Sequence, residues 1–184
     1  MQAVVRELID NGYADTTVER VAARAGIAKT TIYRRWGGLD GLLADLMAEH
    51  AAQEIAVPDE GNLDADLRVL ARGVVTSLRD PAIKAAFASM VATAVQNPVA
   101  QEVLSRFLAT RTAKMTVIIS RAIQRGGLPP GTDAAGVIRT VTALIYYRLF
   151  IAGEQASEDI ADSAAATAAA AARTGVLSAP TTFG

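Results

Sequence analysis

Residues 16–36 read TTVERVAARAGIAKTTIYRRW, and this stretch decides the fold. Thr16 and Glu19 have the S/T-x-x-E spacing of a capping box, which satisfies free amides at a helix start. The apolar residues that follow recur at helical spacing and give one buried side: Val18, Val21, Ala22 and Ala25. Gly26 is suited to end the helix, because glycine adopts a positive φ without strain. The pattern predicts a helix that ends in a tight turn.

A second short helix is expected after this turn. Ile27 is placed to fill the gap between the two helices, while Ile32 and Trp36 are four residues apart and share one inward face. The remaining side chains then cover the outer surface: Lys29, Thr30, Thr31, Tyr33, Arg34 and Arg35. Such donors reach phosphates and base edges, and arginine pairs with guanine. The stretch therefore predicts a DNA-binding helix-turn-helix.

Positive charge is concentrated in this stretch. Between Arg20 and Leu39 there are five basic residues and no acidic one, although the whole chain has a formal net charge of -1. Attraction to phosphate requires only a local basic face. We therefore expect this face to bind double-stranded DNA.

Residues 3–47 resemble the DNA-binding domain of the TetR family of transcriptional regulators. The resemblance rests on LIDNGYADTTVERVA with its Gly12–Tyr13 pair, on ARAGIA, on KTTIYRRW, and on a leucine-rich helix after them. It implies that Thr31, Tyr33 and Arg34 touch DNA, with Tyr33 on a phosphate and Lys29 at the helix tip. The full set of expected DNA contacts is Thr17, Lys29, Thr30, Thr31, Tyr33, Arg34 and Arg35.

The chain departs from the family pattern in three places. Ala28 stands where a serine commonly caps the recognition helix, and Gly38–Leu39 replaces a Ser-Lys pair that often opens the fourth helix. The first helix is expected to begin at about Gln2 with no basic arm ahead of it, which leaves open that Met1 is an internal start.

Composition argues for an all-α fold and against an enzyme. Alanine, the best helix former, is abundant, and no alternating strand pattern occurs. The absence of cysteine excludes thiol chemistry and thiolate metal sites. His50 is the only histidine, and Asp64 and Asp66 fall on different helical faces. We therefore expect no catalytic residue, metal or cofactor.

The periodicity predicts about nine helices, in an N-terminal three-helix helix-turn-helix domain and a larger helical domain for ligand binding and dimerisation. The boundary is placed in the Pro- and acid-rich segment 57–62, which gives a DNA-binding domain over 1–50 and a second domain over 51–184. The expected helices are 2–11, 17–24, 28–35, 39–54, 63–78, 81–96, 99–125, 133–155 and 157–174. No signal peptide is evident, and the longest uncharged stretch, between Lys84 and Glu102, is too broken to span a membrane.

The helix over 133–155 carries two apolar stripes, so both of its sides need to be covered. The alanine-rich run 163–172 after it permits close helix–helix approach. Together they predict a homodimer held by a four-helix bundle. The expected interface residues are Val141, Leu144, Ile145, Arg148, Ala165 and Ala169.

Aromatic, methionine and polar residues alternate in the helices of the second domain. Apolar walls with a few polar groups are typical of small-molecule sites, although the same stripe is also typical of ordinary core. The candidate ligand contacts are Phe87, Met90, Phe107, Arg111, Met115 and Tyr147. That this domain holds a pocket is implied mainly by the family resemblance.

Two functions remain open. One is a cytoplasmic, homodimeric repressor that binds a palindromic operator and is released by an unknown small-molecule effector. Two recognition helices related by a two-fold axis can read half-sites about 34 Å apart. The alternative is a helical protein-interaction module with a degenerate helix-turn-helix. The intact TTIYRR surface at 30–35 favours the repressor.

Overall fold

The protein is described by a computed structural model at residues 1–11, 15–52 and 56–178, with no account of the side chains at 44, 47–52 and 99. Regular structure in this part consists of nine α-helices and one π-helical turn: α1 (Gln2–Asn11), α2 (Val18–Ala25), α3 (Lys29–Trp36), α4 (Leu39–Ala52), α5 (Leu63–Arg79), α6 (Pro81–Ala94), α7 (Pro98–Gln124), α8 (Ala134–Tyr146), η1 (Tyr147–Ile151) and α9 (Glu158–Arg173). The predicted all-α fold is confirmed. The Gly12–Tyr13 pair lies outside the described residues, as do the last two residues of the predicted 39–54 helix and the side chain of His50.

Two compact units make up the chain. The first contains Met1–Glu54 and Arg79–Thr110, and the second contains Ile55–Leu78 and Arg111–Gly184. Helix α6 and the first half of α7, which the sequence placed in the second domain, therefore pack with the helices of the first unit. The division of function between residues 1–50 and 51–184 stays a prediction.

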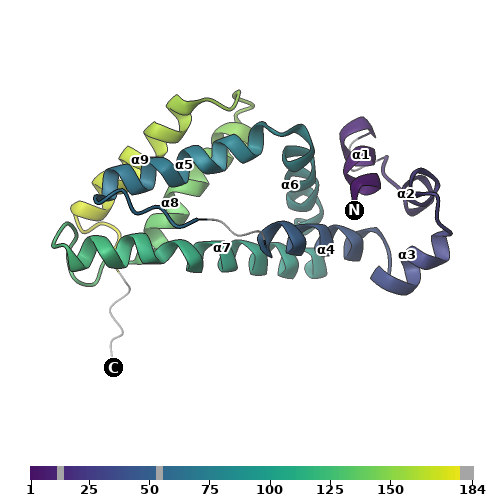
Figure 1. Ribbon diagram of the computed structural model, residues 1–184, viewed down its shortest axis with the longest axis horizontal. Coiled ribbons are helices and arrows are strands. Elements are labelled where there is room, and N and C mark those ends of the chain that lie inside the picture. The colour runs from purple at the N-terminus through teal and green to yellow at the C-terminus, as the bar shows by residue number, and fades with distance from the viewer. Residues whose placement is uncertain (12–14, 53–55, 179–184) are drawn as a thin grey trace. The chain divides into compact units, whose positions relative to one another are not determined.

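Helix α6 is the support on which α1 lies (Figure 1). Val4 and Leu8 of α1 are fully buried. Helix α6 begins as expected after Asp80, whose carboxylate accepts a hydrogen bond from the Ala82 amide at 2.8 Å, with Pro81 in the first turn. This packing holds α1 against α6, and α1 also contacts α2 of the helix-turn-helix.

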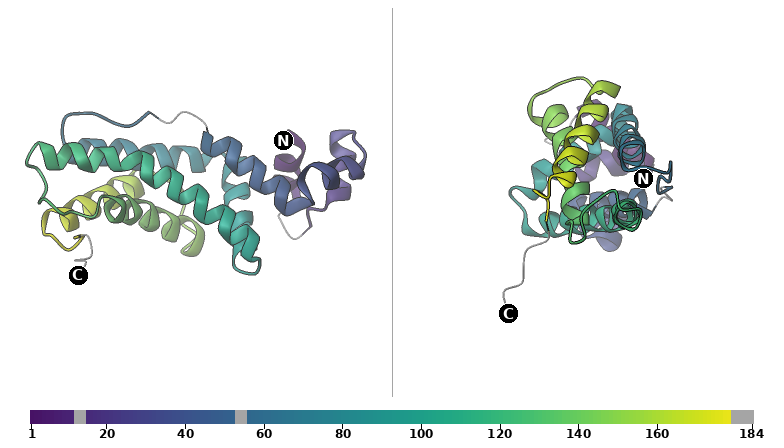
Figure 2. Two further views of the ribbon diagram at one scale, coloured as in Figure 1. Left: turned by 90° about the horizontal axis from the view of Figure 1, so that it is seen from below. Right: turned by 90° about the vertical axis from the view of Figure 1, so that its left-hand side faces the viewer.

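The second unit is built around the α8–α9 pair, which Figure 2 shows side by side. Small buried residues allow the two helices to approach closely, and on α9 they are Ala161, Ala164, Ala165, Ala168, Ala169 and Ala172. Arg72 on α5 donates two hydrogen bonds to the Asp162 carboxylate, both at 2.8 Å, and so joins α5 to α9. The alanine-rich run is thus core of a single subunit.

The stretch Ala134–Ile151 is long and apolar enough to cross a membrane by length and composition alone. Core helices of globular proteins pass the same test. The sequence reading did not select this stretch because Arg139 and Arg148 interrupt it. Three of its residues, Val137, Val141 and Ile145, are buried in the second unit, although only 28% of the stretch is buried.

Candidate nucleic-acid interface

Helices α2 and α3 form the expected helix-turn-helix. Gly26 has φ +67° and its amide donates to the Ala22 and Ala23 carbonyls, which ends α2 as predicted. The N-cap is Thr17, whose Oγ1 accepts a hydrogen bond from the Arg20 amide at 3.2 Å, so the predicted capping box at Thr16 is wrong by one residue. Thr16 is instead buried.

The turn after α2 also differs from the expectation. Ile27 is 41% exposed and does not fill the gap between the helices, and Ala25 is exposed as well. Ile32 is only 1% exposed, and this buried side chain anchors α3 instead.

Helix α3 presents its polar face to solvent. Tyr33 is 49% exposed, and Thr30, Arg34 and Arg35 are exposed around it, while Thr31 is half-buried. The Arg35 guanidinium lies 4.6 Å from the centre of the Trp36 ring. Ala28 at the N-cap provides no side-chain hydrogen bond. Of the predicted DNA contacts, those on α3 therefore share one accessible surface.

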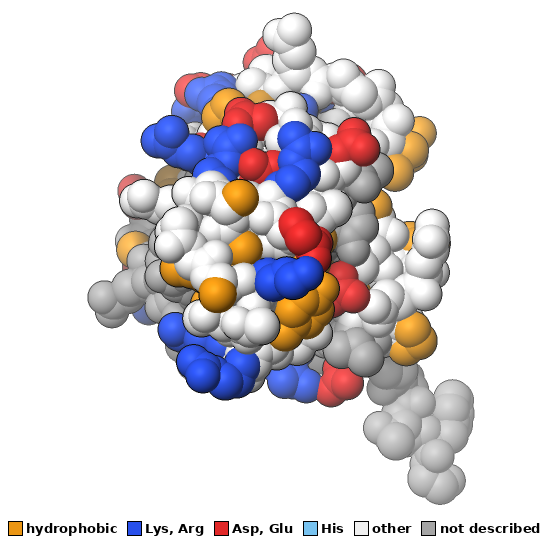
Figure 3. All heavy atoms as spheres, turned by 90° about the vertical axis from the view of Figure 1, so that its right-hand side faces the viewer, with side chains coloured by type: hydrophobic (Ala, Val, Ile, Leu, Met, Phe, Trp, Pro, Cys, Tyr) orange, Lys and Arg blue, Asp and Glu red, His pale blue; other side chains and the backbone are white. Residues whose placement is uncertain are grey.

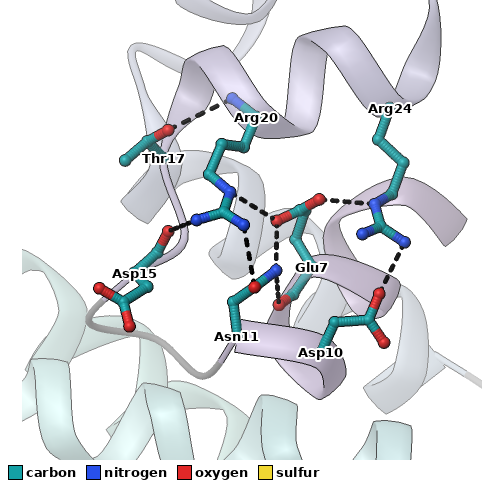
Figure 4. Close-up of polar contacts among 7 residues, drawn as sticks. All are labelled: Glu7, Asp10, Asn11, Asp15, Thr17, Arg20 and Arg24. Carbon is teal, nitrogen blue, oxygen red and sulfur yellow. Dashed lines mark hydrogen bonds and ion pairs between the residues drawn. The ribbon is translucent and has the colours of Figure 1, made fainter.

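Two of the five arginines and lysines in the basic stretch are neutralised by acids from α1 (Figure 4). Arg24 lies 2.6 Å from Glu7 and 2.8 Å from Asp10, and Arg20 lies 3.3 Å from Glu7. The hydrogen bond from Glu7 raises the pKa of the Arg24 guanidinium. The uniformly basic face expected from the sequence needs this correction, because the acids come from residues 10 or more positions earlier in the chain.

Figure 3 shows the result on the face that carries α2 and α3, where acidic side chains lie among the lysines and arginines. Lys29 is 3.7 Å from Glu19, and both side chains are more than half exposed, so this pair is weak and easily exchanged. Among the described residues, Arg34 has no carboxylate partner within 4 Å. The cations available to DNA are therefore Lys29, Arg34 and Arg35.

The joint between α3 and α4 fixes the recognition helix from its C-terminal end. The Trp36 indole Nε1 donates to Asp45 Oδ2 at 2.8 Å. A Cβ atom on Gly41 would overlap the Trp36 carbonyl oxygen and lie 2.9 Å from the carbonyl carbon. Asp40 in the same turn accepts a hydrogen bond from Asn97 Nδ2 at 2.8 Å. Sequence reasoning missed this joint, although a glycine inside a helix is a signal of close backbone approach.

Family models match this architecture over most of the chain. Residues 1–46 match the model described as bacterial regulatory proteins, tetR family, and residues 57–168 match the tetracyclin repressor-like C-terminal domain. The chain belongs to the TetR family. It is a DNA-binding transcriptional regulator and not an enzyme.

Individual TetR-family proteins are similar along nearly the whole chain. The helix-turn-helix-type regulator YdeS of Bacillus subtilis is 27% identical over 154 residues, which are 82% of this chain and 76% of YdeS. Salmonella enterica GusR has the same fold, with a TM-score of 0.74, 20% identity and coverage of 96% and 92% of the two chains. FadR of Bacillus subtilis, solved in complex with stearoyl-CoA, gives a TM-score of 0.70 at 18% identity, with 95% and 96% covered.

The predicted ligand contacts of this TetR-family chain fall in both compact units. Phe87, Met90 and Phe107 belong to the first unit and are buried there, and the Phe87 and Phe107 rings form a tilted pair with centroids 6.4 Å apart. Met115 and Arg111 belong to the second unit, Met115 buried and Arg111 half-buried. The methionines and phenylalanines are accordingly core residues in the structure described.

Tyr147, another predicted ligand contact, has a side chain that is 59% exposed, and its role stays a prediction. Its neighbour Tyr146 is the more buried of the two, and burial raises the pKa of its phenol. The positive charge of Arg111 acts on Tyr146 in the opposite direction. Burial also lowers the pKa of the Arg111 guanidinium. Arg111 and Tyr146 are therefore two part-buried polar groups of the second unit that interact with each other.

Four of the six predicted dimer contacts also need correction. Val141, Ile145, Ala165 and Ala169 are at most 3% exposed. They pack within the second unit, where α8 lies against α9, and offer no surface to a partner subunit. The other two, Leu144 and Arg148, are half-buried, and Arg148 donates hydrogen bonds to the Glu154 carboxylate at 2.6 and 3.0 Å.

No group of three or more His, Cys, Asp or Glu residues able to hold a metal ion occurs within the described ranges. A small cavity in the first unit lies between α4, α6 and α7, with Asp40, Leu43 and Met90 in its lining. Its volume is about 10 Å³, which is the size of a single water. It is too small for an organic ligand.

Proposed function

We propose that this TetR-family regulator is a homodimeric repressor that binds a palindromic operator in the cytoplasm and is released by a small molecule. The observation that supports the proposed DNA contacts is that α3 exposes its polar face while Ile32 on its other side is buried. This geometry lets Tyr33 and Arg34 project from a rigid helix, as a major-groove reader requires. The proposed contacts are Thr17, Lys29, Thr30, Thr31, Tyr33, Arg34 and Arg35.

The outer side of α8 and η1 supports the proposed dimer. Tyr147 is 59% exposed and Ile151 is 73% exposed, and the half-buried Leu144 lies one turn before Tyr147. Exposed apolar groups in one stripe mark an interaction surface. A second copy placed on this stripe by a two-fold axis would give the pair of recognition helices that a palindrome needs.

The second unit also supports a ligand site. Arg111 on α7 and Tyr146 on α8 lie close enough to interact electrostatically, and burial disfavours the charge on Arg111. A ligand with an anionic group would compensate that cost. The FadR complex shows that this fold accommodates stearoyl-CoA in another protein. We propose an effector that combines an apolar body with an acidic group.

One observation favours the alternative, a protein-interaction module with a degenerate helix-turn-helix. Glu7 and Asp10 neutralise Arg20 and Arg24, which leaves fewer cations for phosphate. Three cations remain available, Lys29, Arg34 and Arg35, and all of them lie on α3. This grouping favours DNA binding over the interaction module.

Salt-dependent binding separates the two functions. We expect the full chain to bind random duplex DNA with an affinity that falls as salt rises, with a slope of about -0.9 for each phosphate contacted. Fluorescence anisotropy with a labelled duplex between 50 and roughly 200 mM salt measures the slope. Binding that is absent, or that is independent of salt, would contradict the repressor and leave the interaction module.

Arg34→Ala and Tyr33→Phe should weaken DNA binding in different ways. Loss of Arg34 is expected to cost about 1–3 kcal/mol at one operator position and to relax the base preference there, because a bidentate guanine contact is removed. Loss of the Tyr33 hydroxyl should weaken specific and random DNA by the same factor, because a phosphate contact carries no sequence information. Selection from random DNA followed by titration checks both. Equal losses on both DNAs for both variants would show that the roles are wrongly assigned.

A further inference from the structure

Glu7 is a buried carboxylate on α1 that pairs with two arginines of the helix-turn-helix. Its side chain is 5% exposed and receives Arg24 Nε at 2.6 Å, Arg20 Nε at 3.3 Å and Asn11 Nδ2 at 2.8 Å (Figure 4). It lies on α1, whereas both arginines lie on α2. A single acid from outside the DNA-binding motif therefore holds two cations of the motif.

Both arginines keep part of their surface accessible. The Arg20 side chain is 49% exposed and that of Arg24 is 33% exposed. Arg20 follows the cap residue Thr17 by three positions, so the two lie on one side of α2. Arg20 is held further by Asn11 Oδ1 at 2.9 Å and by the Asp15 carbonyl at 3.4 Å. Each guanidinium is thus close to solvent, but its charge is directed inward to α1.

This arrangement matters because phosphate attraction is independent of sequence. Each additional cation near the DNA raises the affinity for every duplex and so reduces discrimination between operator and random sequence. Salt weakens the attraction between a buried carboxylate and a neighbouring cation less than it weakens the same attraction at an exposed carboxylate. The partner best placed to keep a cation from phosphate is therefore a buried carboxylate.

We propose that Glu7 is a specificity-determining positioning residue, which acts by keeping Arg20 and Arg24 off the phosphate backbone. Sequence-independent attraction then comes mainly from Lys29 and Arg35, while Arg34 reads a base. Glu7 itself does not touch DNA. The inference rests on DNA binding through α2 and α3, and the unmodified chain in the experiment below tests that condition separately.

The test compares the salt slope of the full chain with that of Glu7→Gln on the same random duplex. The variant removes the negative charge and retains hydrogen-bonding atoms. We expect the slope to become steeper by about 0.9 for each arginine that gains a phosphate, and the ratio of operator to random affinity to fall. Asp10→Asn is the matched control, because Asp10 is 51% exposed and leaves Arg24 on Glu7. It should change the slope much less.

Two further measurements keep the test decisive. Adding Arg20→Gln and Arg24→Gln to Glu7→Gln should return the slope to that of the unmodified chain. Arg20→Gln or Arg24→Gln alone, with Glu7 still paired to the other arginine, should leave the slope unchanged. These single variants carry the test if circular dichroism shows that Glu7→Gln does not fold.

Opposite outcomes overturn the inference. A folded Glu7→Gln variant with an unchanged slope would show that Glu7 has only a structural role. A slope that becomes shallower by about 0.9 in either single arginine variant would show that the arginine already contacts phosphate. Absence of DNA binding by the unmodified chain would instead reject the proposed function.

Discussion

Gly41→Ala is expected to abolish DNA binding while leaving the second unit folded. The added methyl group would overlap the Trp36 carbonyl oxygen and approach the carbonyl carbon to 2.9 Å, and both belong to rigid backbone. Relief requires α3 and α4 to separate, which also lengthens the hydrogen bond from Trp36 to Asp45. Overpacking costs about 1–3 kcal/mol, and backbone overlap belongs at the upper end. Since α3 carries the proposed contacts, we expect at least about a 100-fold loss of operator affinity, as a small misplacement suffices.

Gly73→Ala is the matched control, since it makes the same substitution inside α5. A Cβ atom on Gly73 meets nothing within 4 Å, so this variant should keep full DNA affinity and gain about 0.5–1 kcal/mol of stability. Titration of operator DNA and thermal unfolding of both variants provide the measurement. A Gly41→Ala variant that binds like the unmodified chain would show that α3 and α4 are less closely joined than described here.

Ile151→Asp should convert the protein to a monomer that no longer occupies a palindromic operator. Ile151 is 73% exposed, so a charge there costs the single chain little, but burial of that charge in the proposed interface would be expensive. A monomer binds only one half-site of the operator. It therefore loses the gain in affinity that comes from binding both half-sites at once, which is about 100-fold or more. Light scattering and operator titration measure the two effects.

Val95→Asp is the control for this second variant. Val95 is 81% exposed at the end of α6, outside the proposed interface. It should keep the mass and the DNA affinity of the unmodified chain. If Ile151→Asp also retains a dimer mass, the stripe on α8 and η1 is not the interface.

Helix positions could be predicted from the sequence because local rules determine them. The breaks at Asp80–Pro81 and at Gly26 lie within one or two residues of the observed helix ends. Burial of Ile32 and exposure of the α3 polar face followed from spacing alone. These features depend on neighbours within one or two helical turns, and a sequence shows such neighbours directly.

Charge pairing could not be predicted in the same way. Glu7 and Arg24 are 17 residues apart, and their contact depends on how α1 crosses α2. The sequence shows five basic residues in one stretch. In the structure, acidic residues of α1 neutralise two of them. The burial of Glu7 contradicts the general preference of glutamate for solvent and becomes understandable only with both arginines in place.

The sequence did not show which side of α8 packs within the subunit. Both apolar stripes were visible, but nothing local indicates which one faces α9 of the same chain. The π-helical turn at Tyr147–Ile151 adds to the difficulty, because it changes the angle between successive side chains. Tyr147 is exposed, whereas Val141 and Ile145 of α8 are buried.

The contact between α1 and α6 has a practical consequence for building hybrid sensors. A hybrid regulator joins the DNA-binding domain of one protein to the ligand-binding domain of another. From the sequence, the linker near residue 57 is the obvious fusion point. In this protein a division of the chain there would separate α1 from α6, the helix with which it makes most of its contacts. A DNA-binding domain moved into another regulator should therefore include residues 79–110. The exchangeable unit is then made of two separate segments of the gene.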